Sequence, residues 1–134
     1  MKNKRIKIYI ASPYRLEDKE ENVRLQIDAY YHLIKMGFNP YMPVYTHFIV
    51  KQHPDIDTTI SWLEIDKEWL DQCDIMIRLH PKNELGVEIL SSGANEEEEF
   101  AKEKNIPVYH FETIEEMINE IKIISDRFTI MKRI

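Results

Sequence analysis

The chain has 134 residues, and its 18 lysines and arginines against 24 acidic residues give a net charge of −6. This length suits one domain with a single core, and 43% apolar and 31% charged residues are typical of a folded, water-soluble protein. The acidic balance argues against a nucleic-acid groove, and no apolar run approaches the ~18 residues that cross a bilayer, so neither nucleic acid polymer nor membrane is expected as a partner.

The low counts of cysteine and glycine exclude further classes of protein. The single cysteine, Cys73, cannot form an internal disulfide or a cysteine metal cluster, and the basic N-terminus is not followed by a signal peptide, so we expect a cytoplasmic protein. Three glycines do not supply a dinucleotide-binding loop, which needs three within about six residues. His47 and His53 have no third ligand at zinc spacing, so we expect no metal.

In the first half of the chain, alternating β-branched residues predict a strand over 6–11, which Ser12 and Pro13 end. Apolar residues at helical spacing then predict a helix over 18–36, terminated by Gly37. Residues 38–45 carry two prolines and predict a short or irregular strand. A long connection over 46–58 follows, of the kind that often carries function.

In the second half, a helix over 59–72, capped by Asp57 or Thr58, precedes a buried strand over 74–79. A second long loop, 80–92, leads to a helix over 93–104, a strand over 106–111 and a last helix over 114–124 capped by Thr113. Residues 125–134 are expected to form a tail. Its apolar residues, which suit an interface, are Phe128, Ile130, Met131 and Ile134.

The alternation of strands and helices predicts one α/β domain over 1–134, with its core in 5–124 and the tail at 125–134. We expect a three-layer sandwich with a parallel sheet of four to five strands covered by helices on both faces. Ligands of such sheets bind beyond the carboxyl ends of the strands. The site is therefore expected at 12–15, in the 46–58 and 80–92 loops and at the start of the 93–104 helix.

Asp66 lies inside the apolar stripe of its helix, four residues after Trp62 and four before Leu70. An ionised carboxylate is costly to bury unless it is paired or its pKa rises. Two interpretations remain open: an aspartate at the rim of the stripe or bonded to a backbone amide, and a buried functional carboxyl group.

Four consecutive glutamates occupy 96–99, and such a run usually forms a solvated helix face. Glu98 precedes Lys102 by four residues, which predicts a surface ion pair. Glu97 differs from the others because Ala94 and Ala101, both small, share its helix face, and Gly93 lies one turn earlier. Small neighbours allow close approach to other backbone or to a ligand, so Glu97 is the one expected to point inward.

Ser91, Ser92 and Gly93 open the 93–104 helix with hydroxyl groups and free amides, an arrangement that suits a phosphate or carboxylate. The alternative is a plain serine N-cap. Ser12, after the first strand, has the same ambiguity, and Arg15 is a candidate partner for a phosphate.

Five motifs occur in a fixed order. They are Ile8-Tyr9-Ile10-Ala11-Ser12-Pro13-Tyr14, Trp62-x3-Asp66, Leu70-x2-Cys73-Asp74, Ser91-x-Gly93-Ala94-x2-Glu97-x3-Ala101 and Ile106-Pro107-Val108. Over about residues 5–111 the chain thereby resembles the nucleoside 2-deoxyribosyltransferase-like superfamily, which includes the deoxyribosyltransferases and the deoxynucleoside 5′-monophosphate N-glycosidases.

The resemblance implies a flavodoxin-like (Rossmann-like) fold and cleavage of the N-glycosidic bond of a small-molecule nucleoside or nucleotide, with no cofactor. It also implies a homo-oligomer in which a neighbouring chain completes the active site. The catalytic residues it implies are Glu97, Asp66 and Tyr9. The substrate-binding residues expected around them are Ser12, Tyr14, Arg15, His47, Ser91, Ser92 and Gly93.

The function predicted from these residues is hydrolysis of a (deoxy)nucleoside 5′-monophosphate, because Ser91 stands where transferases of the superfamily tend to carry Asp. Glu97 would stabilise or attack the oxocarbenium-like centre, and Asp66 would protonate the leaving base. Two alternatives stay open: a deoxyribosyltransferase that exchanges bases, and a catalytically silent nucleotide-binding module. An NAD-cleaving enzyme is a more distant third.

Overall fold

A computed structural model describes residues 4–13, 19–56, 59–81 and 92–133 of the chain. Within this part, four strands form one sheet in the order β2-β1-β3-β4. The strands are β1 (Lys7–Ala11), β2 (Asn39–Tyr41), β3 (Ile75–Leu79) and β4 (Val108–Phe111). All three pairings are parallel, which confirms the predicted parallel sheet, and the strand order agrees with the flavodoxin-like fold that the resemblance implies.

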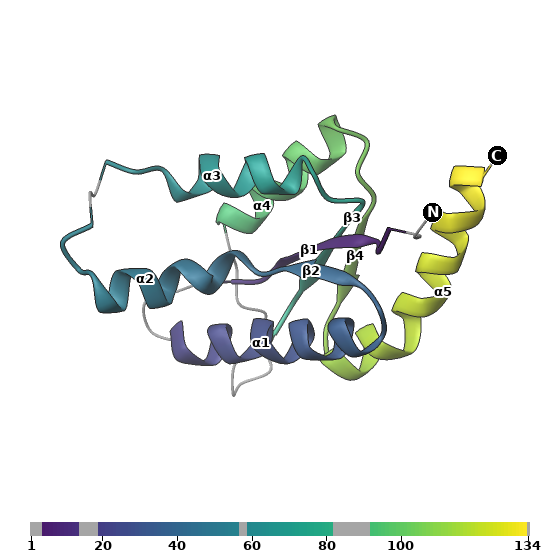
Figure 1. The fold of residues 1–134 in the computed structure, drawn as a ribbon, viewed down its shortest axis with the longest axis horizontal. Helices are drawn as coiled ribbons and strands as arrows, with labels where there is room; N and C mark the ends of the chain where they lie inside the picture. Colours follow the sequence, from purple (N-terminus) through teal and green to yellow (C-terminus); the bar gives the residue numbers. More distant parts are fainter. Residues whose placement is uncertain (1–3, 14–18, 57–58, 82–91, 134) are drawn as a thin grey trace.

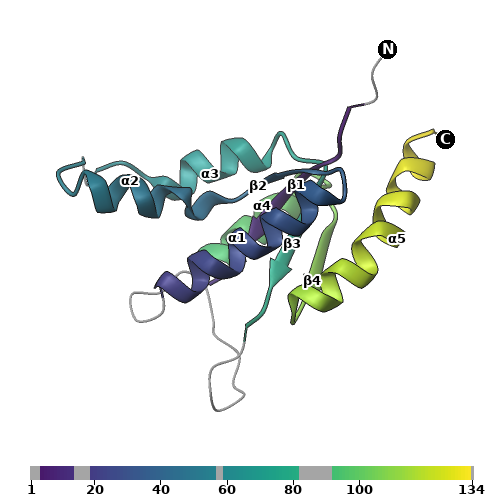
Figure 2. The same cartoon turned by 60° about the horizontal axis from the view of Figure 1, so that its bottom comes forward.

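Helices cover both faces of the sheet (Figure 1 and Figure 2). On one face, α1 (Lys19–Lys35) and α5 (Ile114–Arg133) pack against Ile8, Ile10 and Ile77. On the other, α3 (Trp62–Leu70) and α4 (Ser92–Glu103) pack against Tyr9 and Met76. Successive strand residues point to opposite faces, so Ile8 and Tyr9 belong to different cores.

The end of α1 illustrates how the sequence sets an element boundary. Gly37 has φ +94°, a left-handed conformation, and the amide of Phe38 bonds the Leu33 carbonyl at 3.0 Å. This is the usual glycine C-terminus of a helix, and it turns the chain into β2 as predicted.

The connections run from β1 outward in both directions, since β2 and β3 flank β1. The carboxyl ends of β1 and β3 therefore form the topological switch point of the sheet, where ligands of open α/β sheets bind. Ser12 follows β1 and His80 follows β3, so both lie at this edge.

The predicted long connection over 46–58 is wrong for its first part. Residues 43–45 form a short 3₁₀ helix, η1 (Pro43–Tyr45), and 46–52 form α2 (Thr46–Gln52). Pro43 at the start of η1 has the φ that a helical turn needs, and no glycine or proline interrupts 44–52. Pro43 thus begins a helical turn, whereas Pro40 lies within β2.

The helix predicted over 59–72 is shorter, Trp62–Leu70, and its cap is Ser61. The Ser61 hydroxyl accepts a hydrogen bond from the Glu64 amide at 3.3 Å, as in a Ser-x-x-Glu capping motif. Asp57 and Thr58, the caps expected from the sequence, lie outside the described residues.

The expected tail at 125–134 is wrong for residues up to Arg133, because α5 continues through it. No glycine or proline interrupts 114–133, and Ile121, Ile124 and Phe128 keep the helical spacing. Phe128 packs against the core beneath α1 and α5, whereas Ile130 is 60% exposed.

Candidate active site

Glu97 and Tyr9 form the buried centre of the site. Tyr9 lies in the middle of β1, fully buried, and its hydroxyl donates a hydrogen bond to Oε2 of Glu97 on α4. Glu97 is 7% exposed, and Ala94 and Ala101 on the same face of α4 are also buried. The small alanines bring α4 close to the sheet, so the prediction that Glu97 points inward is confirmed.

Asp66, on α3, faces the same space. Its Oδ1 is buried and has no hydrogen-bond partner within the described part of the chain. Burial, and then the negative charge of Glu97, raise the pKa of Asp66 to about 7. The interpretation that a backbone amide bonds Asp66 therefore does not hold for Oδ1. The pKa of the carboxyl group is raised, as its place in an apolar stripe predicts.

The two carboxyl groups differ in the influences that act on their pKa values. The pKa of Glu97 is about 7, because burial raises it by more than the Tyr9 hydrogen bond and the charges of Arg78 and Lys67 lower it. No such lowering influence acts on Asp66. Both pKa values are therefore about 7, and a proton shared by the pair is favoured on Asp66, because the hydrogen bond and the positive charges favour ionisation at Glu97.

An aromatic wall closes the site on the β2 side, and the sequence analysis did not single it out. Tyr41 stacks on Trp69 with ring centroids 5.2 Å apart, and its ring lies 5.7 Å from that of Tyr9. The charge of Asp66 contributes to raising the pKa of Tyr41, after burial and Tyr45. This wall supplies part of the apolar setting of Asp66. The only sequence signal for it is the aromatic content of β2 and of the α3 stripe.

The described candidate binding residues lie at several places around this centre. Ser12 is 8% exposed and its hydroxyl accepts a hydrogen bond from Gln26 of α1 at 2.8 Å. Gly93 lies in the first turn of α4, where an added Cβ would meet no atom of the described residues within 4 Å. Ser92 is the first residue of α4.

Other predicted binding residues are not brought to the centre by the described contacts. His47, on α2, contacts Glu20 of α1, with 3.2 Å between Nε2 and Oε1. Tyr14, Arg15 and Ser91 lie outside the described residues, as does most of the 80–92 loop.

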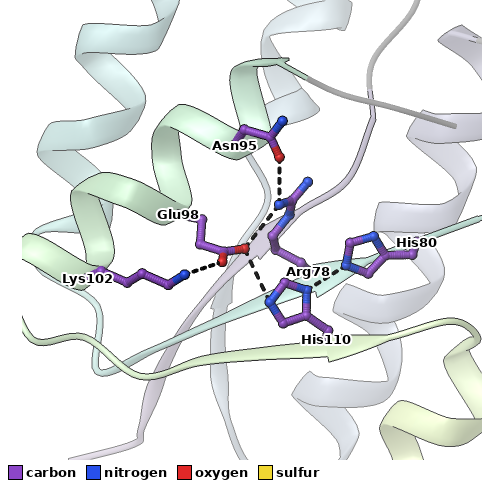
Figure 3. A network of polar contacts seen from close by, with 6 residues as sticks. All are labelled: Arg78, His80, Asn95, Glu98, Lys102 and His110. Carbon is purple, nitrogen blue, oxygen red and sulfur yellow. Dashed lines mark hydrogen bonds and ion pairs between the residues drawn. The ribbon is translucent and has the colours of Figure 1, made fainter. Parts of the chain in front are cut away.

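A polar network joins β3 and β4 to α4 beside the site, and sequence reasoning recognised only one contact of it (Figure 3). The predicted Glu98–Lys102 pair is present at 2.8 Å, but the Glu98 side chain is only 13% exposed, so it is not a simple surface pair. Glu98 also binds Arg78 at 3.0 Å and His110 at 3.2 Å. The sequence signal for the network is a charged residue, Arg78, within an otherwise apolar strand.

Neither a metal site nor a membrane span is found in the described ranges. No group of three or more His, Cys, Asp or Glu side chains there could hold a metal ion. Among the helices described, none combines the length and the apolar character that crossing a membrane requires.

Comparisons with known proteins agree with this architecture. A search of curated proteins finds no match. Among solved structures, the chain is similar to a 2-deoxyribosyltransferase from the psychrotolerant bacterium Bacillus psychrosaccharolyticus, with 23% identity, 78% of this chain and 71% of that chain covered, and a TM-score of 0.55. This similarity shows a deoxyribosyltransferase-like fold. Residues 6–111 match the model of a protein family described as a domain of unknown function, DUF7768, and the chain therefore belongs to that family.

Proposed function

We propose that this protein is an N-glycosidase that hydrolyses a (deoxy)nucleoside 5′-monophosphate to free base and sugar phosphate. The observation that carries the proposal is the buried Glu97 carboxylate, bonded by Tyr9 and facing a second carboxyl group, Asp66, whose surroundings favour the protonated form. Glycosidic cleavage uses such a pair, one carboxylate at the anomeric carbon and one acid at the leaving group.

In the proposed reaction, a Glu97 oxygen attacks C1′ of the sugar while the C1′–N bond breaks. The electron pair of that bond stays on the nitrogen of the base, which takes the proton of Asp66. Water then displaces Glu97 from C1′ and returns a proton to Asp66, so the enzyme is regenerated. The Tyr9 hydroxyl holds Glu97 in position throughout, and no step requires a cofactor.

The phosphate end of the substrate is assigned to the carboxyl edge of the sheet and the start of α4. Gly93 in the first turn of this 12-residue helix supports the assignment, because free amides and the helix dipole attract an anion there. The proposed phosphate contacts, including residues outside the described part, are Ser12, Arg15, Ser91, Ser92 and Gly93, and Tyr14 and His47 are proposed to bind other parts of the substrate.

A deoxyribosyltransferase, in which a second base replaces water, is the alternative favoured by the similar solved structure. Incubation of the protein with a panel of nucleosides and monophosphates, without acceptor base, separates the two. Base and sugar phosphate released from a monophosphate support the hydrolase. Release that needs a second base supports the transferase, and binding without any turnover supports a silent nucleotide-binding module.

The role of Glu97 is tested with two variants on one helix. Glu97→Gln is expected to lower kcat by at least about a hundredfold, the low end for loss of a positioned catalytic group. Glu99→Gln is the matched control, because Glu99 is exposed on the same turn of α4 and should leave turnover unchanged. Equal activity of the two variants would contradict the proposal.

A further inference from the structure

Arg78 reaches from β3 to α4 and contacts the helix on both sides of Glu97. Its Nη1 donates a hydrogen bond to Asn95 Oδ1 at 2.9 Å and another to Glu98 Oε1 at 3.0 Å. These two partners bracket Glu97 in the sequence and belong to the same stretch of α4 (Figure 3). One guanidinium group from the sheet therefore holds the turn of helix that carries the buried carboxylate.

Glu98, which accepts one of these hydrogen bonds, is itself held by side chains from three elements. Its carboxylate receives Arg78 from β3, Lys102 from α4 and His110 from β4, and His110 in turn contacts His80, with 2.6 Å between ring nitrogens. Although burial opposes it, the hydrogen bonds from Lys102 and Arg78 keep the pKa of Glu98 below its ordinary value. Glu98 therefore stays ionised at neutral pH and continues to hold Arg78.

Burial makes the contacts of Arg78 with α4 costly to break. Arg78 is 9% exposed, so breaking its contacts leaves a guanidinium group without partners in a setting of low polarity. Its Nε already lacks a hydrogen-bond partner within the described residues. The bonds that Nη1 makes are therefore costly to lose, and the α4 turn is tied firmly to β3.

The charge of Arg78 also acts on Glu97 directly. Burial raises the pKa of Glu97, and among the influences that lower it Arg78 follows the Tyr9 hydrogen bond and precedes Lys67. The hydrogen bonds of Arg78 to α4 and its charge both assist attack at C1′, which requires a carboxylate that is fixed in place and ionised.

We propose that Arg78 is a positioning residue for Glu97: its bonds to Asn95 and Glu98 fix the turn of α4 that carries Glu97. The kinetic part of this inference rests on the proposed function. The structural part concerns Glu97 alone, so it can be tested even if the protein turns over no nucleotide.

The test measures the titration of the Glu97 carboxyl carbon by NMR in the full chain. Arg78→Met removes the charge and both bonds, and is expected to raise the pKa of Glu97. Arg78→Lys keeps the charge but not the planar group that bridges two acceptors, so the rise should be smaller. Arg24→Met, on the exposed face of α1, is the control and should leave the titration as in the wild type.

The kinetic arm uses the same variants with a monophosphate that the wild type cleaves. Displacement of Glu97 is expected to lower kcat for Arg78→Met by about tenfold to a hundredfold, since a misplacement of about 1 Å has such effects, with KM changed little. Arg78→Lys should restore part of kcat. A wild type without turnover would count against the proposed function and leave the titration result to decide on Arg78.

A milder pair of variants covers the case in which Arg78→Met does not fold. Asn95→Ala removes one of the two bonds from an exposed residue, and Glu96→Ala, its exposed neighbour, is the control. Asn95→Ala should shift the Tyr9 and Glu97 resonances while Glu96→Ala does not. The inference is wrong if the Arg78 and Asn95 variants that fold leave both the Glu97 titration and the Tyr9 resonances unchanged.

Discussion

Two carboxyl groups of similar chemistry receive different surroundings in this site. Glu97 has a hydrogen bond and positive charges that favour its ionised form, whereas Asp66 has an unpartnered buried oxygen, among the described residues, and a negative neighbour. Both pKa values are about 7, so when the pair binds one proton these surroundings favour that proton on Asp66 and the negative charge on Glu97.

Asp66→Asn should remove the fall of activity at high pH. In the wild type the proposed acid must be protonated, so kcat/KM should decline as pH rises through the Asp66 pKa of about 7. The variant should lose that decline and about 10²–10⁴-fold in rate, the usual contribution of a general acid. Base release measured from pH 5 to 9 checks this.

Glu68→Gln serves as the comparison for Asp66→Asn, since Glu68 is an exposed residue of the same helix. Its pH profile should match the wild type. If Asp66→Asn keeps the decline at high pH, another group is the acid.

A glycine lies at the end of α1 and another at the start of α4, and we expect alanine to have different effects on stability at these two positions. Gly37→Ala places a side chain at φ +94° and should destabilise the protein by about 1–2 kcal/mol. Gly93→Ala meets no atom within 4 Å and, lying inside a helix, should not destabilise the fold. Urea denaturation of both variants measures the difference.

The same pair of variants probes the site. If the substrate lies over the first turn of α4, Gly93→Ala should weaken nucleotide binding while the free energy of unfolding is unchanged or higher. Calorimetric titration with a nucleoside monophosphate measures the affinity. Wild-type affinity in Gly93→Ala would place the phosphate elsewhere.

For the molecule as a whole, the buried carboxyl pair should make stability depend on pH. The pKa values of Asp66 and Glu97 rise from 3.8 and 4.5 when unfolded to about 7 when folded. The folded state binds these protons more tightly, so their contribution is fully present below the unfolded values and is lost as pH rises through about 7. Unfolding free energies should therefore be lower at pH 8.5 than at pH 5.5.

Asp66→Asn should flatten this dependence, because one of the two groups no longer titrates. Glu98 does not interfere, since its pKa is lowered and it stays ionised over that range. An unchanged slope in the variant would show that Asp66 is not protonated preferentially in the folded state.

Apolar residues on the outer surfaces bear on assembly. Ile27, Tyr31 and Ile34 are 40%, 54% and 39% exposed on one face of α1, and Ile130 on α5 is 60% exposed. We expect a homo-oligomer, in line with the resemblance that the sequence carries. Light scattering coupled to size exclusion at micromolar concentration checks this, and a monomer would contradict it. Tyr31→Glu should shift the distribution towards monomer.

Local patterns were sufficient for much of the architecture. Local patterns predict α1 with its glycine end, all four strands, the second of them as a short one, and the helix that carries Glu97, because such signals depend on residues close in sequence. The inward direction of Glu97 follows from its small neighbours on one helix face. The helix α2 and the last part of α5 are not predicted, although no glycine or proline interrupts 44–52 or 114–133.

The alternation of elements, the Glu97 motif and the place of Asp66 in an apolar stripe can all be read from residues that lie close together in the chain. Packing in three dimensions brings Asp66 within the electrostatic influence of Glu97, stacks Tyr41 on Trp69 and lets Arg78 hold the α4 turn. Arg78 is 17 and 20 residues from its two partners, and Tyr9 is 88 from Glu97. Contacts at such separations depend on how strands and helices pack, and the pKa values depend on the burial that this packing creates.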